Sequence, residues 1–125
     1  MGLFSKLLGS AERGVQRMAE DNSWNYVRVV CNLDVKSLPA SLVDDAQARM
    51  VQLYNEMARR SEAPFNIPEE AALRLAFVAA RAAASGVGQP AQFAIACAQV
   101  LTTGKQEIRP FCLSIVSRAL ESVSR

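Results

Sequence analysis

The side chains that most often carry out catalysis are few in this chain. Its 125 residues include no histidine and three cysteines, Cys31, Cys97 and Cys112. Without histidine, Ser-His-Asp and Cys-His catalysis are excluded, together with the commonest proton shuttle near neutral pH and most zinc sites. The three cysteines occupy apolar positions and lack a C-x-x-C spacing. We therefore expect reduced thiols that pack in a core and do not act as nucleophiles.

Two pairs of adjacent acids are the remaining candidates for acid–base chemistry. They are Asp44–Asp45 and Glu69–Glu70. Adjacent residues on a helix do not face each other, and each pair falls in the first turn of an expected helix, where acids interact favourably with the helix dipole. We interpret both pairs as helix-start signals, and we predict a non-enzymatic protein with no catalytic residues, no cofactor and no metal.

The basic residues argue only weakly for nucleic acid. The formal net charge is +2, and the arginines are scattered along the chain. The segment 102–109 lies between two expected helices, as in a helix-turn-helix, but the next helix offers few basic or amide side chains for reading base edges. The sequence favours nucleic-acid binding only if the fold gathers one set of arginines: Arg59, Arg60, Arg74 and Arg81.

Three helices in series are expected in the second half of the chain. Prolines and glycines predict helices over 68–85, over 90–103 and from 110 onward. The helix over 90–103 has only a narrow polar stripe, so we predict that it is the central helix. In the helix over 68–85, we expect Glu70 and Arg74 to point outward.

An amphipathic helix is predicted just before these three. Ser41, followed by Asp44 three residues later, has the spacing of a capping box. The apolar residues of this helix recur at helical spacing. Two oppositely charged pairs at i,i+4, Asp45–Arg49 and Glu56–Arg60, support the helix prediction. We expect this helix to end near Arg60.

The segment 24–35 is ambiguous. Alternate positions from Val27 to Val35 are apolar, which is the period of a half-buried strand, but Tyr26, Val27, Val30 and Leu33 also fit one helical face. We favour a short helix after a break at 21–23, because the rest of the chain is helical. The strand alternative requires a partner strand from a second subunit and so indicates a homodimer.

Residues 1–20 form an expected amphipathic helix whose apolar face suits the bundle, a second subunit or a membrane surface. In the membrane interpretation, Phe4, Leu7 and Leu8 insert into the lipid while Lys6 meets anionic headgroups. The apolar runs of the chain are too short for a membrane span. Together with the unpaired cysteines, this predicts a cytoplasmic protein, peripheral to a membrane if the helix binds lipid.

The sequence as a whole predicts an all-α fold, a single domain over 1–125 built as a compact bundle of five or six helices. We expect a bacterial, non-enzymatic protein-binding module, such as an adaptor, a regulator or an immunity-type protein; the alternatives are a peripheral membrane protein and a nucleic-acid-binding domain. Because aromatic and arginine side chains dominate binding energies at interfaces, we select five candidate partner-binding residues: Trp24, Tyr26, Tyr54, Arg59 and Arg60.

Overall fold

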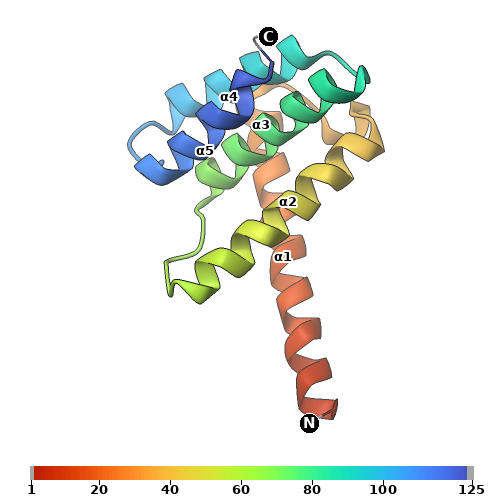
Figure 1. Ribbon diagram of the computed structural model, residues 1–125, viewed down its shortest axis with the longest axis vertical. Helices are drawn as coiled ribbons and strands as arrows, with labels where there is room; N and C mark the ends of the chain where they lie inside the picture. Colours follow the sequence, from red (N-terminus) through yellow and green to blue (C-terminus); the bar gives the residue numbers. More distant parts are fainter. Residues whose placement is uncertain (1, 124–125) are drawn as a thin grey trace.

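The computed structural model describes the backbone of residues 2–123 and the side chains of residues 16–123. This part of the chain is all-α and contains no strand, and its five α-helices pack against each other (Figure 1). The predicted helical bundle is therefore confirmed. The elements are α1 (Gly2–Cys31), a short 3-10 turn η1 (Val35–Ser37), α2 (Ala40–Arg59), α3 (Ile67–Ser85), α4 (Pro90–Thr103) and α5 (Pro110–Glu121).

Helix α3 is the central helix of the bundle. It contacts α1, α2, α4 and α5, and every residue from Pro68 to Ala80 is buried. Helix α4 keeps one side in solvent, where Ile95 is 62% exposed. The prediction that the helix over 90–103 is central was therefore wrong. An apolar composition does not guarantee burial, whereas the small alanines of α3 let neighbouring backbones approach it from several sides.

Three charged side chains of α3 are buried: Glu69, Glu70 and Arg74. Glu70 and Arg74, which were expected to point outward, are 2% and 0% exposed. The expectation fails because the two groups lie one helical turn apart and pair with each other, which removes the usual reason for keeping an isolated charge in water. Pairing between buried charges leaves no trace in the hydrophobic pattern.

Helix α1 runs without interruption through the break predicted at 21–23. The Ser23 hydroxyl donates a hydrogen bond to the Glu20 carbonyl within the helix, at 2.9 Å, and Trp24 and Val27 are buried against the bundle. Residues 24–31 are helical, as favoured, and the strand alternative is wrong. The chain leaves α1 at Asn32, whose φ is 53°, and enters η1.

The helices after α1 begin and end close to where proline and glycine predict. Helices α4 and α5 begin at Pro90 and Pro110, and α3 ends before Gly86, whose φ of 71° suits glycine. The i,i+4 pairs of α2 form, at 3.4 Å for Asp45–Arg49 and 3.8 Å for Glu56–Arg60.

The capping box lies at α3 and not at α2. Asn66 Oδ1 accepts a hydrogen bond from the backbone N–H of Glu69 at 2.9 Å, and Glu69 Oε1 accepts one from the Asn66 N–H at 3.0 Å. Helix α2 begins at Ala40, after Pro39, with no side-chain cap. Ser41 therefore lies inside the first turn, and the capping role predicted for it was wrong.

We predict that Asn66→Ala destabilises the fold and that Ser41→Ala does not. The first change removes the cap of the central helix and the hydrogen bond from Asn66 Nδ2 to the Glu107 carbonyl. It should lower the free energy of unfolding by about 1–2 kcal/mol, and Ser41→Ala by less than about 0.5 kcal/mol. Urea denaturation measures both; equal losses would contradict the cap assignment.

Candidate functional site

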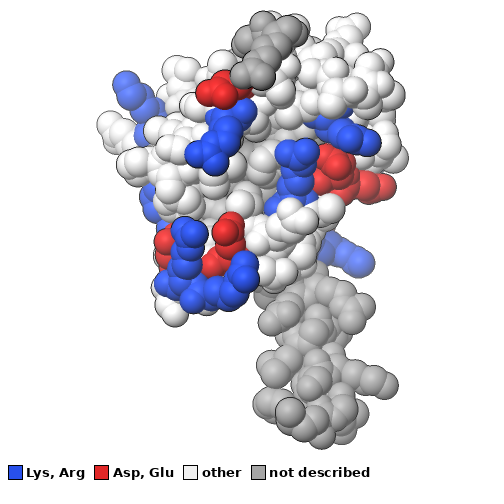
Figure 2. Space-filling model, in the orientation of Figure 1, with Lys and Arg blue, Asp and Glu red and all other residues white. Residues whose placement is uncertain are grey.

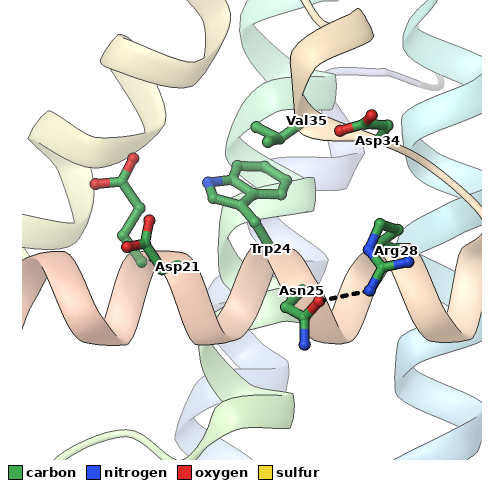
Figure 3. Close-up of a pocket in the computed structure, with 7 residues that line it drawn as sticks. Asp21, Trp24, Asn25, Arg28, Asp34 and Val35 are labelled. Atoms are coloured by element: carbon green, nitrogen blue, oxygen red, sulfur yellow. Dashed lines mark hydrogen bonds between the residues drawn. The ribbon is translucent and has the colours of Figure 1, made fainter.

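A cleft between the second half of α1 and the segment that enters η1 is the best candidate for a functional site. Its volume is about 260 Å³. Figure 3 shows the side chains that surround it, which come from two stretches of the chain: Glu20, Asp21, Trp24, Asn25 and Arg28 from α1, and Asp34 and Val35 from the turn.

Trp24 gives this cleft its unusual chemistry. The side chain is only 5% exposed, yet its indole Nε1 has no hydrogen-bond partner among the described residues. In Figure 3 the indole nitrogen faces the side of the cleft where Asp21 lies. Buried tryptophan N–H groups usually find an acceptor, because an unmade hydrogen bond costs about 1–3 kcal/mol. Beside the cleft there is thus a covered donor that lacks an acceptor among the described residues.

Other hollows lie on the described surface, and three of them have no buried polar atom without a partner among their lining residues. The largest of these three, of about 560 Å³, lies beside Met18, Ile67 and Glu70. A second, of about 380 Å³, lies between α1 and α4, beside Val30 and Ile95. The Trp24 cleft is smaller than either, but its lining is chemically more specific.

A buried charged pair lies where α3 packs against α2. Arg74 Nη2 is 3.3 Å from Glu70 Oε1, and Arg74 Nη1 donates a hydrogen bond to the Gln47 side chain of α2. Burial raises the pKa of Glu70 and lowers the pKa of Arg74, although each group's charge opposes the shift of the other. The negative charge of Glu20, on the cleft wall, favours a higher pKa for both groups, which adds to the shift of Glu70 and opposes that of Arg74.

Glu69, the neighbour of Glu70, makes the most hydrogen bonds of any carboxylate described. Besides the capping box, its oxygens accept bonds from the Arg109 backbone N–H at 2.9 Å, from Arg109 Nε and Nη2 at 2.8 Å each, and from Cys112 Sγ at 3.3 Å. Burial alone would raise the pKa of Glu69, but these donors outweigh it and lower the pKa to about 2. The group joins the starts of α3 and α5 and lines none of the four hollows described above.

The cysteines are packed in the helical core or against it, as expected. Cys97 Sγ donates to the Ala72 carbonyl and Cys31 Sγ to the Ala96 carbonyl, each at 3.3 Å. Burial raises the pKa of Cys31, and it raises those of Cys97 and Cys112 to about 12. These thiols are therefore protonated at neutral pH. Among the described residues, no three acids or cysteines come together as a metal site.

The five predicted partner-binding residues lie in different settings. Trp24 lines the cleft, whereas Tyr26, two residues along α1, projects about 200° away around the helix. Tyr54 is half-buried against Phe65, with ring centroids 5.6 Å apart. Arg59 and Arg60 are exposed at the end of α2.

Two other sets of residues were predicted from the sequence, an arginine patch and a membrane-binding group. Because Arg74 is buried, it cannot join a surface patch with the other arginines. The membrane-binding candidates, Phe4, Lys6, Leu7 and Leu8, lie outside the side chains that the structure describes. None of the described helices combines the length and the apolar character needed to span a bilayer.

Sequence reasoning missed the acidic wall of the cleft, although a signal for it was present. Glu20 and Asp21 precede Trp24 by four and three residues, which places all three on one face of a continuous helix. The predicted break at 21–23 hid this relation. Asp34 follows the end of α1 in the sequence, and no local pattern indicates that it lies in the same cleft as Trp24.

We predict that Glu69 is a main source of acid sensitivity in this fold. A carboxylate whose folded pKa is about 2 and whose ordinary value is 4.5 stabilises the native state above pH 4.5, and the stabilisation is lost as the pH falls toward 2. The loss should reach about 3 kcal/mol between pH 6 and pH 2. Glu69→Gln should remove this component of the pH dependence of urea unfolding, whereas Glu121→Gln, at an exposed site on α5, should retain it.

We predict strong coupling between Glu70 and Arg74. Arg74→Met alone leaves a buried carboxylate without its partner and should cost about 3–5 kcal/mol, whereas Glu70→Met with Arg74→Met should be close to the original stability or above it. The exposed pair Glu56–Arg60 has the same spacing and should couple by only about 0.3–0.5 kcal/mol. A double-mutant cycle on each pair measures the difference, and equal couplings would contradict it.

No family model, no curated protein and no solved structure matches the chain. A functional conclusion therefore depends on the geometry and charge of the cleft.

Proposed function

We propose that this chain is a non-enzymatic protein-binding module, an adaptor or a regulator, and that a segment of its partner enters the Trp24 cleft. The observation that carries the proposal is the buried indole N–H, which has no acceptor within the described part of the chain and faces a cleft. A backbone carbonyl of a partner would supply that acceptor once the side chains covering the nitrogen move aside.

The size of the cleft supports a protein partner over a small-molecule substrate. Pockets for drug-sized ligands and cofactors enclose roughly 300–1,000 Å³, and this cleft has about 260 Å³. A cleft of this size suits one inserted side chain with its adjoining backbone. The thiols, which are the most nucleophilic groups of the chain, do not line it, and their raised pKa values disfavour covalent chemistry.

Site-specific photo-crosslinking in the native cell tests the proposal. A benzophenone amino acid replaces Asn25, which is exposed on the cleft wall, or Ser117, which is exposed on α5 as a matched control. We expect one protein to crosslink at position 25 and not at position 117.

The affinity of that purified partner then tests the role of the indole N–H. Trp24→Phe keeps an aromatic ring but removes the donor, so it should weaken binding about two- to tenfold, the worth of one hydrogen bond. Circular dichroism checks that the variant is folded. Identical crosslinks at both positions, or an affinity unchanged by Trp24→Phe, would refute the proposal.

A further inference from the structure

The walls of the Trp24 cleft carry unequal charge. Three carboxylates and one guanidinium line it, an excess of two negative charges: Glu20, Asp21 and Asp34 against Arg28. Among the described side chains, neither Glu20 nor Asp21 takes part in an ion pair. Arg28 Nη2 instead donates to Asn25 Oδ1 at 2.8 Å (Figure 3). A cleft of this charge attracts cations and repels phosphate and carboxylate groups.

The same cleft has an apolar wall. Figure 3 shows Val35 beside the ring of Trp24, with Asp21 on one side of them and Asp34 on the other. Lysine and arginine side chains pack their methylene stems along apolar surfaces while their charged ends remain in polar surroundings. An apolar wall flanked by carboxylates therefore fits a long basic side chain better than a compact ion.

The indole N–H of Trp24 distinguishes a peptide from a free cation. A hydrogen-bond donor cannot pair with an ammonium or a guanidinium group, both of which are donors themselves. A backbone carbonyl next to the basic side chain would satisfy it. A metal ion is disfavoured, because the three carboxylates do not come together as a cluster that could hold one.

We infer that the partner segment entering the Trp24 cleft is basic, and that it places one lysine or arginine side chain between the carboxylates and its own backbone carbonyl on the indole N–H. This inference rests on the proposed function, because it names the chemistry of the protein partner at the same cleft. It also makes an anionic lipid surface an unfavourable ligand for this face.

The single tryptophan of the chain makes the test direct, because one indole signal reports on the cleft alone. The full chain, labelled with ¹⁵N, is titrated with tetralysine and tetraarginine peptides and, as matched controls, with tetraserine and tetraglutamate. We expect at least one basic peptide to shift the Trp24 indole resonance saturably. The shift should weaken as the salt concentration rises, since screening reduces charge attraction. The controls should leave the resonance unmoved.

Charge-neutral variants separate the cleft from the general surface. Asp21→Asn and Glu20→Gln keep the shapes of their side chains and should each weaken binding of the basic peptide about two- to fivefold, the range for exposed charge pairs. Glu121→Gln removes one negative charge from α5, away from the cleft residues, and should leave the affinity unchanged. Asp21 is exposed, so its substitution is not expected to unfold the chain.

Three outcomes would overturn the inference: an indole resonance that no basic peptide moves, one that tetraglutamate moves equally, or an affinity that Asp21→Asn and Glu20→Gln leave unchanged. If crosslinking at position 25 identifies a partner whose binding depends on Trp24 while the basic peptides fail, the proposed function stands and its basic ligand is wrong. If the crosslinking and the peptides both fail, both proposals are wrong.

Discussion

The burial of α3 is the constraint on which the rest of this structure depends. A helix that contacts four others needs its first turn fixed, because the backbone N–H groups there have no partners within the helix. Glu69 and Asn66 satisfy this need in the capping box, and Glu69 also binds Arg109. Arg109 in turn donates to the carbonyls of Ala63 and Pro64, at 3.2 and 3.0 Å. One carboxylate thus holds the loop before α3, the start of α3 and the start of α5 together.

The adjacent acids show how neighbours in sequence diverge in chemistry. Successive residues of a helix project about 100° apart, so Glu69 faces α5 whereas Glu70 pairs with Arg74, which reaches Gln47 of α2. Glu69 accepts hydrogen bonds from several donors, and its pKa falls to about 2; Glu70 has the one arginine, and its pKa is raised. Burial acts to raise the pKa of both carboxylates, and only at Glu69 do the hydrogen-bond donors together outweigh it.

The helical architecture could be predicted from sequence because its signals are local. Proline and glycine mark the ends of α3, α4 and α5 within a few residues, and the i,i+4 pairs of α2 form as expected. Some errors, such as the cap assigned to Ser41, are local, but others arose where the deciding partner is distant. The bond between Glu69 and Arg109 spans 40 residues, and the Glu70–Arg74 pair is buried only because neighbouring helices cover it. Likewise, the Trp24 cleft needs both an unbroken α1 and the turn that brings in Asp34.

The sequence suggested exposed aromatic and arginine side chains as anchors, whereas the proposed function places a segment of the partner in a cleft. Tyr54 packs against Phe65, and Trp24 is buried with one polar atom unpaired. A buried, unpaired donor destabilises the isolated chain, so a partner that satisfies it gains affinity that the free protein lacks. The acidic wall acts in the same direction, since Glu20 and Asp21, which form no ion pair among the described residues, favour a basic ligand. In this view the chain supplies the receptor for an anchor, and its partner supplies the anchor.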